Sequence, residues 1–161
     1  MKTAIIYCSR HHGNTKQVLD AIAGAAGNVT LIDAQAPAET DLSGYDLIGF
    51  ASGIYFSKFH KTVLAFAQEH LPENKPVFFL YTCGEEKSGY TKAIAEIAGG
   101  KHARVLGEYG CLGYDTYGPF KLVGGIAKGH PDSGELAGAV SFFHDILRKA
   151  EAGKVLSLIH I

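Results

Sequence analysis

The chain has 161 residues, of which 47% are hydrophobic and 19% are charged, and its formal net charge is −1. This length and composition are typical of one domain with a single buried core. The small net charge argues against a surface that recruits nucleic acid, and the apolar runs are too short to cross a bilayer. We therefore expect a cytoplasmic protein with no nucleic-acid partner and no membrane span.

The cysteines and histidines do not form the patterns of a disulfide framework or a metal site. Cys8, Cys83 and Cys111 are odd in number and lack C-x-x-C spacing, which suits a reducing compartment. Cys83 and Cys111 end two successive predicted strands, so they are either buried, inert thiols or a redox pair, and we favour inert thiols. His11 and His12 have no further ligand at metal-binding spacing, and we expect no metal ion.

Short apolar runs alternate with longer segments of helical periodicity, which is typical of βαβ units and of a parallel sheet covered on both faces. Between the second and third runs, residues 35–45 include Pro37 and Gly44 and predict a loop rather than a helix. The expected strands are Thr3–Cys8, Val29–Asp33, Asp46–Ser52, Val77–Cys83 and Ala103–Cys111. The expected helices are Asn14–Ala26, Phe59–His70, Tyr90–Ala98 and Leu136–Ala150.

Two segments near the C-terminus stand out from this pattern. Leu112–Gly134 is rich in glycine and longer than a simple connection, which makes it a candidate functional loop. We expect the domain to span residues 1–153, with a tail at 154–161 after a helix that ends before Gly153. The last six residues read Leu-Ser-Leu-Ile-His-Ile, the translation of a common transposase adapter used in DNA library preparation. Leu156–Ile161 is therefore either non-native, which we favour, or an apolar tail that packs on the domain.

The loop after the first strand has the composition of an anion-binding site. It places small, hydroxyl and glycine residues where a buried strand turns into a helix, and the first N–H groups of a helix attract anions. The side chains of Ser9, Asn14 and Thr15 add possible donors to a phosphate. The alternative is that these residues only cap the helix and that Gly13 only turns the chain. The loop comprises Ser9, Arg10, His11, His12, Gly13, Asn14 and Thr15.

The pattern Ser9-x-x-His12-Gly13-Asn14-Thr15 after an apolar strand resembles the phosphate loop of flavodoxins, although His12 stands where that family most often has Thr. Two further segments, Ala51–Phe56 and Thr82–Gly84, fall where flavodoxin-like proteins place their flavin-ring loops. The resemblance implies FMN as the cofactor. It also implies a three-layer α/β fold with a five-stranded parallel sheet of order 2-1-3-4-5, helices on both faces, and FMN at the switch point between the first and third strands.

The resemblance also implies roles for particular side chains. We expect Tyr55 to stack on the flavin, because its phenol tolerates partial exposure, and we expect Phe56 to be more buried. Tyr90 is a second candidate for a flavin face, and Gly53 would let a peptide turn when the flavin changes redox state. The expected cofactor-binding residues are Ser9, Arg10, His11, His12, Gly13, Asn14, Thr15, Ser52, Gly53, Ile54, Tyr55, Phe56, Thr82, Cys83, Gly84 and Tyr90.

The implied function is electron transfer or flavin-dependent oxidoreduction, with a redox protein or a small-molecule electron acceptor as partner. Ser57–Lys61 resembles the corresponding segment of flavodoxin-like protoporphyrinogen oxidases. Lys58, Lys61, Lys121 and Lys128 form either a basic docking rim or ordinary solvated lysines.

Two other functions stay open at this point. A cofactor-free flavodoxin-like interaction module is possible. A low-molecular-weight phosphatase would use Cys8 as nucleophile, but that chemistry needs an arginine where this chain has Asn14.

Overall fold

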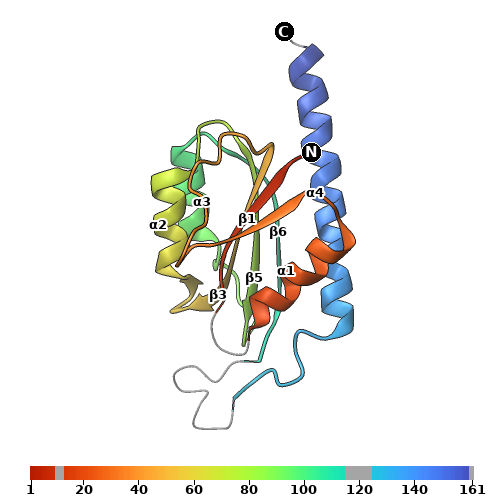
Figure 1. Cartoon of the computed structure of the whole chain (residues 1–161). Coiled ribbons are helices and arrows are strands. Elements are labelled where there is room, and N and C mark those ends of the chain that lie inside the picture. The colour runs from red at the N-terminus through yellow and green to blue at the C-terminus, as the bar shows by residue number, and fades with distance from the viewer. Residues whose placement is uncertain (10–12, 115–124, 160–161) are drawn as a thin grey trace.

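The computed structural model describes residues 1–9, 13–114 and 125–159 of the chain. Its elements alternate as expected for a doubly wound α/β fold: β1, β5 and β6 are each followed by a helix, β3 reaches its helix through the short β4, and β2 leads through a crossover loop to β3 (Figure 1). The strands are β1 (Thr3–Cys8), β2 (Val29–Asp33), β3 (Leu47–Tyr55), β4 (Lys58–Phe59), β5 (Pro76–Cys83) and β6 (Arg104–Leu112). The helices are α1 (Asn14–Ala25), α2 (Lys61–His70), α3 (Lys92–Gly100) and α4 (Ser133–Ile159).

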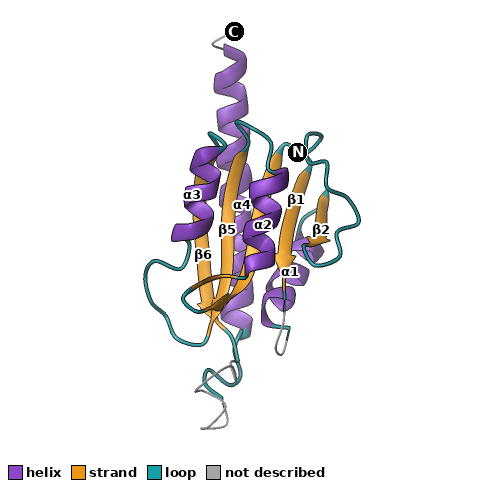
Figure 2. Cartoon of the chain, turned by 90° about the vertical axis from the view of Figure 1, so that its left-hand side faces the viewer, coloured by secondary structure: helices purple, strands orange, loops and turns teal. Residues whose placement is uncertain are grey.

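The helices form two layers around the sheet, α1 and α4 on one face and α2 and α3 on the other (Figures 1 and 2). The α1/α4 side of the core includes Ile5, Leu19 and Phe143, which are almost completely buried. The other side is built in the same way from the opposite faces of the strands together with α2 and α3. Each central strand therefore contributes alternate side chains to both halves of the core.

The five long strands are parallel and lie in the order β2-β1-β3-β5-β6. This is the order predicted from the sequence, counted over the parallel strands. The chain leaves β1 toward β2 on one side and then crosses to β3 on the other side, so the switch point lies between β1 and β3. The carboxyl ends of the strands meet at the lower edge in Figure 1. The register pairs Cys8 with Ser52 and Gly53 with Thr82, which brings the three predicted cofactor loops to that edge.

The described residues form six strands rather than the five that we predicted. The additional strand is β4, which pairs antiparallel with the end of β3 through a two-residue turn at Phe56 and Ser57. Both turn residues have positive φ, as the tight turn of a β-hairpin requires. The sequence prediction missed this hairpin because the turn lacks the Asn-Gly or Asp-Gly pair that usually marks one. Consequently, β3 continues to Tyr55, and α2 begins at Lys61 rather than at Phe59.

The predicted end of the last helix is also wrong, because α4 continues through Gly153 to Ile159. Gly153 has no positive φ, so it does not form the left-handed cap that ends many helices. Beyond it Val155, Leu156 and Leu158 are exposed, where α4 projects past the sheet (Figure 1). No helix among the described residues is both long and apolar enough to cross a membrane. The loop predicted at residues 35–45 is confirmed, since turns and bends occupy it.

We predict that deleting residues 156–161 changes the free energy of unfolding by less than about 0.5 kcal/mol, because exposed side chains contribute little to folding. By contrast, Ile146→Ala, which truncates a side chain that is 1% exposed, should cost about 2–5 kcal/mol. Thermal and urea unfolding of the two variants would measure the difference. A large loss on deletion would mean that the projecting turns of α4 pack against the domain in solution.

Candidate functional site

The loop between β1 and α1 turns at Gly13, a position whose positive φ favours glycine. Gly13 has φ 65° and stands at the N-cap of α1, where it provides no side chain to cap the helix. The first turn of α1 contains no acidic residue. The backbone N–H of Lys16 donates to Ser9 Oγ at 3.1 Å, which closes the loop on itself. The predicted residues Arg10, His11 and His12 lie outside the described residues.

Asn14, the first residue of α1, connects this loop to the end of β6. Its Nδ2 donates to the backbone carbonyl of Tyr114 at 2.7 Å. Its Oδ1 is buried and has no hydrogen-bond partner among the described residues. Gly113 lies so close that a Cβ there would be 2.6 Å from Asn14 Nδ2. The absence of a side chain at position 113 is therefore what lets the Asn14 amide reach β6.

Thr15 is fully inside the structure and binds the end of β5. Its hydroxyl oxygen is 2.9 Å from that of Thr82, and either hydroxyl can donate to the other. Both residues are less than 5% exposed. When Thr82 donates, the proton of Thr15 remains available to a further acceptor at the start of α1. The hydrogen bond therefore places α1 against β5 and leaves Thr15 with a donor to offer.

At the end of β3, alternation of side chains turns Gly53 and Tyr55 to the α1 side of the sheet, as it does Ala51. The ring of Tyr55 lies over Gly53, with its Cε2 and hydroxyl 3.4 Å from the position of a Cβ at residue 53. It also makes an edge contact with the His60 ring, with centroids 5.0 Å apart. Gly53 is extended and lacks positive φ. A Cβ at this position would make ordinary van der Waals contact with the Tyr55 ring.

Two other residues predicted in this segment face inward. Ile54 packs on the core cluster of the α2/α3 side. Ser52 is 0% exposed; its hydroxyl accepts from the backbone N–H of His60 at 3.0 Å and donates to the Gly53 carbonyl. His60 in turn caps α2, because its Nδ1 accepts from Thr62 N–H at 3.1 Å. Ser52 therefore holds the hairpin and the start of α2 against β3.

The expectation that Phe56 is buried is wrong. The side chain is 81% exposed, because Phe56 occupies the first position of the β3–β4 turn and has no neighbouring strand to pack on. Phe56 and the following Ser57 have φ of 51° and 65°. Such a conformation costs a bulky residue about 1–3 kcal/mol. The backbone that departs from ordinary geometry at this edge is thus the turn at 56–57 and not Gly53.

The loop after β5 begins at Gly84 and is closed by Tyr90. Tyr90 is only 7% exposed, its hydroxyl donates to the Glu85 carbonyl at 2.6 Å, and its ring makes an edge contact with Tyr81. These contacts give Tyr90 a structural role under the loop. Cys83, at the end of β5, is 5% exposed. Of the residues predicted in this segment, Gly84 retains a partly exposed position at the edge.

The three cysteines are buried and none forms a disulfide. The thiol of Cys83 donates to the Cys111 carbonyl at 3.6 Å. Burial, followed by the negative charge of Glu135, raises the pKa of Cys111 to about 12. A thiol with so high a pKa is almost entirely protonated at neutral pH and is a poor nucleophile. These properties favour inert thiols over a redox pair.

We predict that iodoacetamide at about pH 8, near the ordinary thiol pKa, leaves Cys111 unmodified in the folded protein and modifies it fully after denaturation. Peptide mass spectrometry would measure both. A disulfide between Cys83 and Cys111 that forms under mild oxidation would contradict this prediction and restore the redox-pair interpretation.

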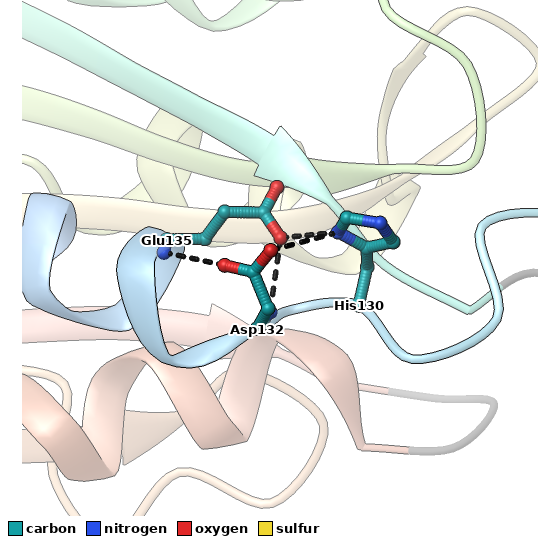
Figure 3. A group of neighbouring side chains, drawn as sticks. All are labelled: His130, Asp132 and Glu135. Atoms are coloured by element: carbon teal, nitrogen blue, oxygen red, sulfur yellow. Dashed lines mark hydrogen bonds and ion pairs between the residues drawn. The ribbon is translucent and has the colours of Figure 1, made fainter.

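A cluster that the sequence analysis did not identify joins the start of α4 to the end of β6 (Figure 3). His130, Asp132 and Glu135 place ligand-type atoms within 4.8 Å of one another. Asp132 and Glu135 form a reciprocal cap, each side chain accepting from the other's backbone N–H at 2.8 and 2.9 Å. Helix capping and pairing with His130 therefore account for the cluster. The Asp-x-x-Glu spacing was a signal that the sequence already contained.

The strand order, the two helical layers and the glycine turn after β1 define the class of this protein as a flavodoxin-like doubly wound fold. Residues 4–121 match the family described as Flavodoxin domain (Flavodoxin_5). The chain belongs to the flavodoxin family.

Individual relatives agree with this membership. The chain is 38% identical over 150 residues to an uncharacterized protein of Methanocaldococcus jannaschii, covering 92% of this chain and 99% of the relative. A flavodoxin from the domain Archaea superposes with a TM-score of 0.68 and 19% identity, covering 94% of this chain and 99% of the other. A flavoprotein from Lactobacillus acidophilus, solved in complex with FMN, gives a TM-score of 0.54 and 18% identity, covering 68% and 92%. At these identities the two solved structures demonstrate the shared fold.

Proposed function

We propose that this protein binds FMN at the carboxyl ends of β1, β3 and β5 and transfers electrons through it. The observation that carries the proposal is the position of the α1 N-terminus. It begins at Gly13, which has no side chain to cap the helix, at the switch point between β1 and β3. In the first turn, the N–H of Lys16 donates to Ser9 Oγ. The first N–H groups of a helix and its dipole favour a phosphate there. The loop from Ser9 to Thr15 would hold the FMN phosphate.

The buried Oδ1 of Asn14 supports a ligand that carries more than a phosphate. It is an acceptor without a donor, and a buried acceptor left in that state costs about 1–3 kcal/mol. A phosphate dianion has no proton to donate, whereas the ribityl chain of FMN carries several hydroxyl groups. The donors at the start of α1 and this unpaired acceptor therefore fit the two parts of one FMN molecule.

Tyr55 is the residue that we propose to stack on the isoalloxazine ring. It lies on the α1 side of the sheet, the same side as the start of α1, and is partly exposed. The predicted contacts from Thr82, Cys83 and Gly84 would come from the neighbouring end of β5. The buried side chains at the end of β5, together with Ser52, Ile54 and Tyr90, would pack beneath the site rather than touch the flavin.

Bound FMN supplies the electron-accepting ring, and the protein supplies binding, orientation and the exclusion of water. The partner that we propose is a redox protein or a small-molecule electron acceptor. Lys58 and Lys61 are exposed beside the hairpin and give this side a positive rim toward such a partner. Three buried cysteines without a disulfide are compatible with a reducing, cytoplasmic compartment.

We predict that FMN binds much more tightly than riboflavin, since only FMN carries the phosphate. Thr15→Ala removes a hydroxyl donor and should weaken FMN binding by about 1–3 kcal/mol, with little effect on riboflavin. Flavin fluorescence quenching measures all four dissociation constants. Equal affinity for FMN and riboflavin would contradict the phosphate loop, and a wild-type protein that binds no flavin would instead indicate the cofactor-free interaction module.

We predict that Tyr55→Ala weakens both FMN and riboflavin by about 0.5–1.5 kcal/mol, because ring stacking does not involve the phosphate. Phe56→Ala is the matched control, because Phe56 is the neighbouring aromatic residue and its side chain is 81% exposed. This substitution should change either affinity by less than about twofold. The same titration measures both variants. A larger loss in Phe56→Ala than in Tyr55→Ala would show that the hairpin turn closes over the flavin.

A further inference from the structure

We propose that Glu135 is a positioning residue for the cofactor phosphate loop, and that it holds the first residue of α1 through the backbone at the two ends of the β6–α4 connection. This inference rests on the proposed function, because it gives a carboxylate outside the binding site a role in FMN affinity. Glu135 is on α4, whereas the phosphate loop follows β1 at the other end of the chain. A chain of hydrogen bonds connects Glu135 to Asn14 at the start of α1.

Glu135 binds both ends of the connection between β6 and α4, and Figure 3 shows its contacts with His130 and Asp132. Its Oε2 accepts from the backbone N–H of Leu112, the last residue of β6, at 3.0 Å. Its Oε1 accepts from the backbone N–H of Asp132 at 2.9 Å and pairs with His130 Nδ1. The hydroxyl of Tyr109 also donates to the Glu135 carbonyl at 2.8 Å. One carboxylate therefore holds the backbone at the end of β6 and the backbone just before α4 together.

The same backbone then contacts α1. Tyr114 N–H donates to the His130 carbonyl at 2.9 Å, which joins the two ends a second time. The Tyr114 carbonyl is the acceptor for Asn14 Nδ2. Gly113 donates its N–H to the Cys83 carbonyl at 2.8 Å and packs on the Asn14 side chain. A shift of Leu112–Tyr114 after loss of Glu135 would thus move the Asn14 anchor at the start of α1.

The charge on His130 strengthens this arrangement. Its hydrogen bond to Glu135 raises the pKa of His130 above the ordinary 6.5. Besides Glu135, the titratable groups coupled to the cluster are Asp132, just before α4, and Tyr109 and Cys111 on β6. The positive imidazolium is present below the raised pKa and is lost as the pH rises through it. The contribution of the pair to positioning should therefore weaken on the alkaline side.

The test compares FMN and riboflavin binding to Glu135→Ala and to the wild type, with EDTA present. Loss of a charge-assisted hydrogen bond corresponds to about a tenfold effect or more. We expect the FMN dissociation constant to rise by about that factor and the riboflavin constant by a clearly smaller factor, because riboflavin shares the ribityl contact with Asn14 but lacks the phosphate. A purely structural role would weaken both ligands together. Glu73→Gln is the matched control, because Glu73 pairs with His102 at 2.8 Å before β5, at the other end of the sheet.

A second variant keeps the test independent of folding defects. His130→Gln retains a donor toward Glu135 but does not titrate. The ratio of wild-type to variant FMN affinity should fall between about pH 6 and pH 9 as the imidazolium is lost, and taking this ratio cancels the titration of the FMN phosphate. An unchanged preference for FMN over riboflavin in Glu135→Ala would overturn the inference and leave the proposed function intact. Wild-type protein that fails to bind FMN would overturn the proposed function itself.

Discussion

The central strands have no face turned to solvent, and the rest of the structure depends on this burial. Along β1 and β3, consecutive residues such as Ile5 and Ile6, or Leu47 and Ile48, are 0% exposed although they point to opposite faces. Burying such side chains contributes about 1.5–3 kcal/mol each, and it is possible only if helices cover both sides of the sheet. Parallel strands also require crossover connections, which supply these helices. All carboxyl ends are consequently gathered at one edge.

Polar groups at that edge are satisfied mainly by partners from distant parts of the chain. Thr15 pairs with Thr82 across two strands, Asn14 reaches Tyr114, and Glu135 binds Leu112. Each bond joins the start of a helix to the end of β5 or to the end of β6. Because hydrogen bonds in partly buried positions are costly to break, they hold the start of α1 at a defined place relative to the sheet. Asn14 Oδ1 is the acceptor there that the described residues leave unpaired.

The β3–β4 hairpin departs from ordinary backbone geometry at this edge. Phe56 and Ser57 accept positive φ although neither is glycine. Ser52, the His60 cap of α2 and the two-residue β4 hold the turn in place. The result is an exposed ring, that of Phe56, next to Tyr55 in the chain. Tyr55 is the side chain that we propose to contact the flavin. Strain of this kind gathers at functional sites because the surrounding structure must over-determine it.

The sequence by itself determined the class of fold and predicted where the cofactor site lies. Hydrophobic periodicity identified all five parallel strands and four helices, with most ends within two residues, and the Ser9–Thr15 pattern predicted a phosphate loop at a strand end. These features are local, because hydrophobic periodicity and turn chemistry are written in neighbouring residues. Resemblance supplied the strand order, which no local pattern contains.

The tertiary structure decided which of the predicted site residues are exposed at the carboxyl edge of the sheet and which are buried beneath it. Nothing local distinguishes Ser52, Ile54 or Tyr90 from residues at the surface of the site, because their burial depends on strands and helices elsewhere in the chain. The exposure of Phe56 followed from a hairpin turn without its usual glycine. The link from Glu135 to Asn14 joins positions that are far apart in sequence, through the backbone at the end of β6. Such contacts exist only after the sheet has brought those segments to one edge.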